Sequence, residues 1–361
     1  MWLRRNLKFS LIVGNLFLAF FMVLCFLVPF IDPRVYWPIS FLGLAYPYLF
    51  LFCVGFFAFW VILRKWYFLI SLVTIILGWT YSERTFNWHF EDVLKEEKSI
   101  KILSYNVRNF DFYNWRERTQ SKDKFFKLFK REDADILCFQ EFFHLEDSTS
   151  ELEYVDSLSQ RLGYQHYYFH TRVHSFNQRY GMAIFSKYPI VNNAKMDFKT
   201  RAKNGCIYAD ITIGDSLLRV YNVHFQSIQF SHDDYAYFES NEKDVKGMKT
   251  IFKKLKKAFM KRADQADFLA KHLSLNYGKV VLCGDFNDTP MSYSYERIKQ
   301  SRRFKDAFVE VGNGFGSTYV GAFPFMRIDH FFVDDNLELK SFKVLEEKYS
   351  DHYPIICEIV I

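Results

Sequence analysis

Polar residues of a few chemically useful types stand at the ends of short apolar segments in this sequence. They are Asn106, Glu141, His224, Asp285, Asn287, Asp329, Asp351 and His352. The apolar segments are four to eight residues long and are bounded by Gly, Pro, Asn or Asp, which is typical of buried strands. A single carboxylate in such a place often caps a helix or a turn. Because side chains at strand ends share one crevice in an α/β fold, we expect this whole set to converge.

These residue types suit metal-assisted hydrolysis of a phosphate ester. Carboxylates and an Asn carbonyl are the hard oxygen donors that Mg²⁺ prefers, with Mn²⁺ as the alternative. An aspartate beside the metal can orient or deprotonate an attacking water. A histidine that is paired with a carboxylate can keep its charge and stabilise a phosphoryl transition state. The sequence contains no serine nucleophile elbow, Walker loop or HExxH motif that would indicate another chemistry.

Seven motifs extend this pattern over most of the chain. In order, they are ILSYNVRNF, DILCFQE, GMAIFSKYPI, VYNVHFQ, VLCGDFNDTP, RIDHFFV and SDHYPI. In type and order they resemble the endonuclease/exonuclease/phosphatase superfamily, which includes DNase I-like nucleases and inositol-polyphosphate phosphatases. The resemblance covers about residues 99–361. It implies an α/β (α+β) fold of four layers, in which two packed β-sheets are flanked by helices.

The resemblance also implies roles for the residues that bind metal and phosphate. Asn106, Glu141 and Asp351 are expected at or near a Mg²⁺ or Mn²⁺ ion. Asn287 is expected to hold the substrate phosphate, together with Arg108. Some nucleases of the superfamily carry an aspartate where this chain has Arg108, so the start of the first motif is more similar to the DNase I branch.

For the catalytic residues, the resemblance implies that Asp285 orients or activates the attacking water. It implies that His352 contacts the scissile phosphate and is oriented by Asp329. His224 is similar to the second histidine of the DNase I branch. The acid that pairs with that histidine is replaced here by the neutral Gln178, which leaves a catalytic and a structural role open for His224.

The N-terminal part of the chain has the composition of a membrane segment. Phe9–Ile31 and Pro38–Leu63 are 23 and 26 residues without a charged side chain, and Trp66–Ser82 adds 17. A bilayer core takes roughly 20 apolar residues in a helix, so we predict three transmembrane helices. A cleaved signal peptide is the alternative for the first stretch, but two further stretches follow it directly.

The basic residues near these stretches predict their orientation. Arg4, Arg5 and Lys8 precede the first stretch, and Arg64 and Lys65 separate the second from the third. The positive-inside rule places both groups in the cytoplasm. Three crossings then put the catalytic domain outside the cytoplasmic membrane. Residues 1–82 account for +5 of the net charge of +6, so the basic pI reflects topology and does not indicate nucleic-acid binding.

The sequence therefore predicts a transmembrane anchor (1–82), a linker (83–98) and a catalytic domain (99–361). The segment Lys243–Arg262 stands out within that domain because it is a strongly basic amphipathic helix. It is either an ordinary solvated face or a surface that contacts lipid headgroups or substrate phosphates. The six cysteines form no metal-binding spacing and are interpreted as small buried hydrophobes.

Two enzymatic hypotheses follow for the substrate. The first is a membrane-anchored phosphoesterase or pyrophosphatase that acts on a lipid-linked or small extracytoplasmic phosphate. The alternative is a nuclease that cleaves DNA or RNA, for which the basic helix would have to neutralise phosphates. A non-enzymatic scaffold is a poor fit, since the full set of motif residues is present. Membrane lipids are the expected partners, and the sequence gives no reason to infer an obligate protein partner.

Overall fold

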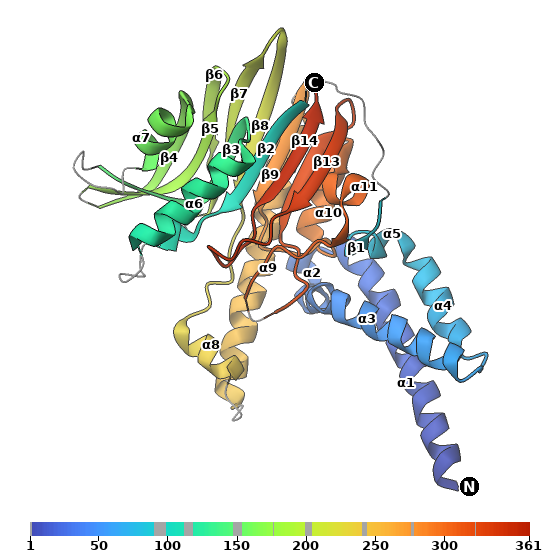
Figure 1. Ribbon diagram of the computed structural model, residues 1–361. Helices are drawn as coiled ribbons and strands as arrows, with labels where there is room; N and C mark the ends of the chain where they lie inside the picture. Colours follow the sequence, from blue (N-terminus) through green and yellow to red (C-terminus); the bar gives the residue numbers. More distant parts are fainter. Residues whose placement is uncertain are drawn as a thin grey trace.

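The computed structural model describes residues 2–89, 99–111, 118–146, 154–175, 177–198, 204–239, 244–275, 278–321 and 323–361. Figure 1 shows a domain built on two β-sheets, with a group of apolar helices below it and the N-terminus at the far end of that group.

The first sheet is formed by strands from both ends of the catalytic domain. Its order is β13 (Glu338–Val344), β14 (Ile355–Val360), β2 (Ser99–Asn106), β3 (Ile136–Leu145), β5 (Gln178–Ser186) and β4 (His166–Ser175). Only β2 and β3 run parallel in this sheet, and Asn106 at the carboxyl end of β2 lies opposite Gln140 in the middle of β3, which continues beyond the predicted strand end at Phe139. This register brings the first and second motifs side by side.

The second sheet carries the remaining motifs. Its order is β10 (Phe304–Asp306), β12 (Asp329–Asp334), β9 (Lys279–Asp285), β8 (Ser216–His224), β7 (Gly205–Ile213) and β6 (Ile190–Met196). β8 and β9 are parallel, with His224 opposite Asp285, and β12 is antiparallel to β9, with Asp329 opposite Asp285. Three polar residues of the sequence pattern therefore lie in one row across three neighbouring strands.

The two sheets pack face to face through alternating apolar side chains, which include Ile102, Ile184, Val220 and Val281. A polar bridge crosses this core at Asn222, whose Oδ1 accepts from Nε2 of Gln140 at 2.7 Å and whose Nδ2 donates to the Phe139 and Ala183 carbonyl oxygens. Since a buried amide left without a partner costs stability, this bridge favours one alignment of the sheets.

Helices cover the outer face of each sheet. On the first sheet lie α6 (Arg118–Glu132), α7 (Tyr154–Asp156) and the helical turn Ser157–Arg161. On the second lie the carboxyl half of α9 (Val245–Ser274) and α10 (Tyr293–Ser301), while α11 (Ala307–Val311) packs near β13. The resulting helix–sheet–sheet–helix arrangement is the two-sheet α/β sandwich that the sequence predicts.

The apolar N-terminal region contains two helices that are long enough to cross a bilayer, and the third predicted span differs from the expectation. α1 (Trp2–Leu27) and α3 (Ser40–Ile62) are joined by the short helices Val28–Phe30, α2 (Pro33–Tyr36) and Trp37–Ile39. Trp66–Ser82 is divided into α4 (Phe68–Leu77) and α5 (Trp79–Ser82) at Gly78. At about 1.5 Å per residue, α4 is roughly half as long as a bilayer core is thick.

Part of the predicted linker 83–98 belongs to the folded domain. β1 (Phe86–Asn87) pairs with β11 (Gly314–Phe315), and the buried Arg84 forms an ion pair of 2.8 Å with Glu296 on α10. Residues 90–98 lie outside the described part of the chain. The apolar N-terminal region therefore passes directly into contacts with the catalytic domain.

The helix that contains the predicted basic segment extends beyond that segment. Lys243 lies outside the described residues, and α9 begins at Val245 with Asp244 as its cap and continues to Ser274. α8 (His232–Glu239) precedes it. In Figure 1 both helices extend below the sheets, on the side where the apolar helices lie. All six cysteines are buried and free, as their apolar surroundings predict.

Candidate active site

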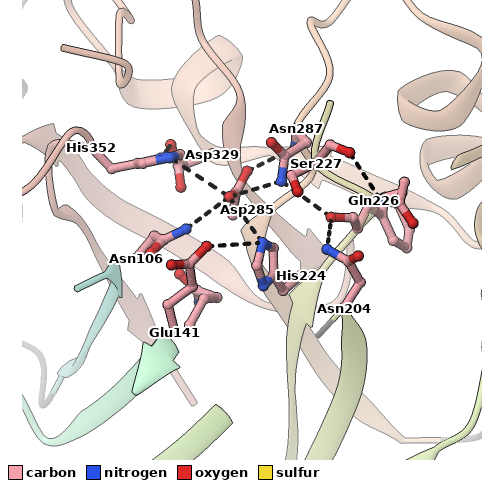
Figure 2. A network of polar contacts seen from close by, with 12 residues as sticks. Asn106, Glu141, Asn204, His224, Gln226, Ser227, Asp285, Asn287, Asp329 and His352 are labelled. Carbon is pink, nitrogen blue, oxygen red and sulfur yellow. Dashed lines mark hydrogen bonds and ion pairs between the residues drawn. The ribbon is translucent and has the colours of Figure 1, made fainter. Parts of the chain in front are cut away.

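The polar residues at the strand ends converge on Asp285, as Figure 2 shows. His224, Asp285 and Asp329 come from the second sheet, at the ends of β8 and β9 and at the start of β12. Asn106 and Glu141 come from β2 and β3 of the first sheet, and His352 lies just before β14. The site therefore lies across the junction of the two sheets, where their strand ends meet.

Asp285 is buried and accepts several hydrogen bonds. Its Oδ2 accepts from Nδ2 of Asn106 at 3.0 Å and from Nδ2 of Asn287 at 3.0 Å. Its Oδ1 accepts from the backbone N–H of Asn287 at 2.8 Å. Burial, and then the neighbouring carboxylate of Asp329, raise the pKa of Asp285, although His352 and His224 act in the opposite direction. A carboxylate that is fixed and made more basic in this way is suited to accept a proton from water.

His352 is held between two carboxylates. Its Nδ1 lies 2.9 Å from Oδ2 of Asp329, and its Nε2 lies 3.7 Å from Oδ2 of Asp285. Burial alone would lower the pKa of His352, but Asp329 and then Asp285 outweigh it and raise that pKa well above its ordinary value. Asp329 is itself positioned by Thr318, whose hydroxyl accepts a hydrogen bond from the Asp329 backbone N–H at 3.0 Å. The imidazole is therefore held as a cation with a fixed ring orientation.

The second histidine of the site lies beside the same carboxylates. Nε2 of His224 is 3.6 Å from Oδ2 of Asp285 and 3.9 Å from Oε1 of Glu141. Gln178, at the start of β5, accepts a hydrogen bond from the hydroxyl of Tyr180 at 2.9 Å. Asp285 and Glu141, which the sequence assigns to other roles, therefore lie near His224.

Two site residues adopt backbone conformations that are unusual for their type. Glu141 has φ of 50° where the pairing of β3 with β5 shifts register between Phe139 and Phe142. Asn287 has φ of 53° and donates from Nδ2 to the Phe225 carbonyl at 3.1 Å. Such conformations cost energy and persist where the surrounding structure holds them. In these conformations Asn287 donates to Asp285 from its backbone N–H and its Nδ2, and Oε1 of Glu141 lies 3.9 Å from Nε2 of His224.

A glycine is required in β9 just before Asp285. Gly284 has φ of 138°, and a Cβ atom there would lie 2.0 Å from the Val223 carbonyl oxygen. Only glycine fits this close approach of two parallel strands. In the motif VLCGDFNDTP, the glycine is therefore needed for the approach of the strands, and the aspartate for the chemistry of the site.

The donors at this site fit a divalent cation. Ligand atoms of Asp285, Asp329 and His352 all lie within 4.8 Å of one another, but a charged imidazole has no free lone pair, so only the two carboxylates of this group can contact a metal. The raised pKa of Asp285 reflects the cost of a buried negative charge, which a cation beside it would offset. Glu141 borders the same space with carboxylate oxygens of the kind that Mg²⁺ prefers, whereas Asn106 presents its Nδ2 to Asp285 and its Oδ1 accepts from the Arg108 backbone N–H (Figure 2).

Asp351, a predicted metal ligand, and Arg108, a predicted phosphate ligand, contact each other at the rim of the site. Nε of Arg108 is 3.7 Å from Oδ2 of Asp351, and the Arg108 side chain is mostly exposed. The backbone N–H of Arg108 donates to Oδ1 of Asn106 at 3.1 Å. An exposed cation beside an anionic pocket can meet a substrate phosphate, which keeps the predicted role of Arg108 open.

Sequence reasoning missed the residues that support the loop after Asp285. Arg262 ends the predicted basic segment, yet it is fully buried and donates to the Asn287 carbonyl oxygen. Its Nε lies 3.2 Å from Oδ2 of Asp288. His330 also contacts this loop through the Asp288 carbonyl oxygen, at 3.0 Å from Nε2. In the sequence, Arg262 is one more basic residue of the segment, and no local pattern distinguishes it from the exposed lysines.

Comparisons with known proteins agree with this geometry. The model of the endonuclease/exonuclease/phosphatase family matches residues 103–352, and a domain of unknown function (DUF8431) matches residues 8–85. No curated protein matches the chain.

Solved structures share the fold at low sequence identity. A family protein from Bacteroides thetaiotaomicron is 18% identical, with a TM-score of 0.53 over 74% of this chain and 99% of that one. A mannosyl-6-phosphatase from the same species is 17% identical, with a TM-score of 0.52 over 73% and 100%. ANGEL2, a 2′,3′-cyclic phosphatase solved with adenosine-2′,3′-vanadate, is 16% identical, with a TM-score of 0.52 over 73% and 96%. At these identities the likeness shows the fold alone.

Proposed function

The chain belongs to the endonuclease/exonuclease/phosphatase family and is a hydrolase of phosphoester bonds, and from this premise we propose that it is a membrane-anchored, metal-dependent phosphoesterase. The observation that carries the proposal is the pairing of His352 with Asp329 beside the buried Asp285. The arrangement places a proton acceptor and a fixed cation on neighbouring sides of one pocket.

In the proposed reaction, Asp285 orients a water molecule and takes its proton as the water attacks phosphorus. Asn287, whose Nδ2 donates to Asp285 and to the Phe225 carbonyl oxygen in this structure, turns one of these N–H groups to a phosphoryl oxygen. The charged His352 stabilises negative charge as the ester bond breaks. Asn106, Glu141 and Asp351 are the residues we assign to a bound Mg²⁺ or Mn²⁺. The metal, when bound, polarises the phosphoryl group and lowers the pKa of water.

We further propose that the catalytic domain lies outside the cytoplasmic membrane. Nζ of Lys8 lies 5.1 Å from the Tyr67 ring centroid, so the basic start of α1 is close to the Arg64–Lys65 turn. The opposite end of α1 and the start of α3 contact the catalytic domain. Both basic groups therefore lie far from the catalytic domain. This supports three membrane crossings, in which α1 leads out of the cytoplasm, α3 leads back and the short α4–α5 segment crosses again to the domain.

The topology proposal is tested by reporter fusions to the C-terminus of the full chain. An extracytoplasmic domain predicts an active alkaline phosphatase fusion and an inactive cytoplasmic reporter. The opposite pattern would show that α4 and α5 do not cross, since two crossings return the chain to the side of its N-terminus.

For the substrate, we propose a phosphate carried by a membrane lipid. One loop connects the site with the membrane helices: Tyr319 forms a β-bridge with His352, and Tyr48 of α3 donates to the Pro324 carbonyl oxygen at 2.7 Å. Phe323, which immediately precedes Pro324, has its ring centroid 5.3 Å from that of Phe238 on α8. A substrate held in the bilayer would be presented next to the catalytic pocket. A nuclease is the alternative, for which the lysines of α9 supply the favourable charge.

A substrate panel separates these proposals. The full chain, purified in detergent with Mg²⁺ or Mn²⁺, is given plasmid DNA, bis-p-nitrophenyl phosphate and a prenyl pyrophosphate, with Asp285→Asn as the inactive control. The lipid proposal predicts cleavage of the prenyl substrate, with loss of that cleavage in Asp285→Asn. Cleavage of plasmid alone would favour the nuclease instead. Absence of cleavage with every substrate and metal would contradict the proposed function.

A further inference from the structure

The loop that follows the catalytic Asp285 runs directly into the membrane segment. After Asn287, the hydroxyl of Thr289 donates to the Gly43 carbonyl oxygen of α3 at 3.0 Å. The Pro290 carbonyl oxygen accepts from Nη1 of Arg84 at 3.2 Å. Within five residues, the chain therefore passes from the reacting pocket to contacts with the membrane segment and with the residue just after α5.

Met291 completes this connection. It is buried among apolar side chains of α1 and α3, namely Met22, Cys25, Tyr46 and Cys53. The approach to α3 is as close as the backbone allows, since a Cβ atom on Gly43 would lie 2.3 Å from the Met291 carbonyl oxygen. Any side chain at Gly43 must displace the loop or the helix.

The loop itself has little freedom between these two anchors. Arg262 donates to the Asn287 carbonyl oxygen, and Ser294 donates to Oδ2 of Asp288 at 2.7 Å. A shift imposed at Met291 is therefore passed along a short, buried and hydrogen-bonded segment to Asn287.

We infer that the apolar N-terminal helices act as positioning elements of the active site, with Gly43 and Thr289 as the positioning residues that set the place of Asn287. This inference rests on the phosphoesterase activity proposed above. It goes beyond anchoring, because a domain that is merely attached to a membrane would not depend on the packing of α3 against its catalytic loop.

A matched pair of glycine substitutions tests the inference in the full chain reconstituted in phospholipid vesicles. Gly43→Ala places a methyl group against Met291, whereas a Cβ on Gly55 of the same helix meets no atom within 4 Å. With bis-p-nitrophenyl phosphate, we expect kcat to fall about 10- to 100-fold in Gly43→Ala, as for a catalytic group displaced by about 1 Å, with KM changed less than kcat. Gly55→Ala is expected to keep the wild-type kcat. Equal kcat values in the two variants would overturn the inference.

A second pair covers the case in which Gly43→Ala fails to fold. Thr289→Val removes the hydroxyl donor at nearly constant volume, whereas Thr289→Ser keeps it. The inference predicts a lower kcat for the valine variant and recovery in the serine variant. A valine variant with wild-type kcat would contradict it.

One measurement is independent of catalysis and separates failure of the inference from failure of the proposed function. Amide hydrogen exchange of the peptide that contains Asn287 is followed in wild type, Gly43→Ala and Gly55→Ala. Faster exchange only in Gly43→Ala supports positioning, even if no assayed substrate is cleaved. Unchanged exchange in Gly43→Ala would overturn the inference, even if the wild type is active.

The amino-terminal half of α9 exposes a face of apolar side chains. Val245, Met248 and Phe252 share one face and are 61%, 45% and 41% exposed. Lys246, Lys249 and Lys253 lie beside that face, lining a groove of 430 Å³. Exposed apolar side chains next to a row of lysines are typical of helices that lie in a membrane interface.

The exposed face of α9 lies beside the start of α3, which indicates where this face stands relative to the bilayer boundary. The ring centroid of Phe252 lies 5.0 Å from that of Phe41, near the start of α3. Nζ of Lys256 lies 5.4 Å from the ring centroid of Trp37, a residue type that settles at the bilayer boundary. The exposed stripe of α9 therefore lies beside the point where α3 begins its apolar run.

We propose that this face of α9 binds the headgroups of anionic phospholipids. Native mass spectrometry of the full chain in detergent, titrated with phosphatidylglycerol or phosphatidylcholine, tests the proposal. Replacement of Lys246, Lys249 and Lys253 by Gln is expected to weaken phosphatidylglycerol binding about tenfold or more. The same change at Lys124, Lys127 and Lys130 of α6 is the matched control and is expected to leave binding unchanged.

Two outcomes would contradict lipid binding at α9. One is equal affinity for the anionic and the neutral lipid. The other is displacement of phosphatidylglycerol by millimolar inorganic phosphate, which would assign the lysines to free phosphate rather than to a headgroup in the bilayer.

Discussion

Nδ1 of His352 lies 2.9 Å from Oδ2 of Asp329, and this contact joins the two β-sheets at the centre of the site. Asp329 begins β12 of the second sheet, whereas His352 precedes β14 of the first. The carboxylate fixes the ring orientation and accounts for much of the raised pKa of His352.

Asp329→Asn is expected to lower kcat by about 10²- to 10⁴-fold, because the amide removes the charge that keeps His352 protonated. Loss of Asp329 lowers the pKa of His352, so the alkaline limb of the pH–rate profile should move to lower pH. Asp334→Asn, at the other end of β12 and paired with Arg302, is the control for losing a buried carboxylate. A profile that keeps its alkaline limb would argue against a charged His352 in the reaction.

Glu141→Gln tests the metal site, since a neutral amide is a poorer ligand than a carboxylate. We expect at least about tenfold more Mg²⁺ or Mn²⁺ for half-maximal activity, with the same change in calorimetric titration of the ion. Glu146→Gln, just beyond the same strand and paired with Arg179, should titrate as wild type. Unchanged metal affinity in Glu141→Gln would remove Glu141 from the ligand set.

Arg262→Met is expected to destabilise the fold by about 3–5 kcal/mol, because it leaves the buried Asp288 without its cation. Urea denaturation, followed by the fluorescence of the full chain in detergent, measures the change. Lys257→Met, on an exposed turn of the same helix, is expected to stay within about 0.5 kcal/mol of wild type. Similar midpoints for the two variants would contradict the supporting role of Arg262.

His330 predicts a pH dependence of stability. Burial foremost, and then Arg327, lower the pKa of His330 to about 3. The unfolded chain, with an ordinary histidine pKa of about 6.5, takes up a proton that the folded state resists. Stability from this group is therefore complete above pH 6.5 and is lost progressively as the pH falls from there toward 3.

His330→Phe should flatten the thermal stability profile between pH 6.5 and 4, whereas His166→Asn, half-buried on β4, should follow wild type. Parallel profiles for wild type and His330→Phe would show that His330 does not titrate as its burial implies.

Much of the site could be predicted from sequence, because strand ends are marked by local patterns. The apolar run before Asp285 and the glycine at 284 indicate both a strand and its end, and the structure places Asp285 beside Asp329 and His224 as expected. Convergence from two sheets follows from the resemblance rather than from any local pattern.

What could not be predicted depends on tertiary contacts. Arg262 belongs to the same basic segment as the exposed lysines before it, and the packing of α9 on the second sheet separates them. Similarly, Trp66–Ser82 has no charged side chain, but Gly78 divides it, and helix length cannot be read from hydropathy alone. The contact of Thr289 with Gly43 joins residues that are 246 positions apart and leaves no periodic signal.

The bridge from Gln140 to Asn222 has a consequence for the enzyme as a whole. Neither amide touches the proposed substrate, but together they fix how the sheets are aligned, and the site is divided between those sheets. A slide of one sheet past the other by a single residue would separate His352 from Asp329 while leaving each sheet intact. Catalytic rate should therefore report on the alignment of the sandwich, and substitutions deep in its interior should alter turnover before they alter secondary structure.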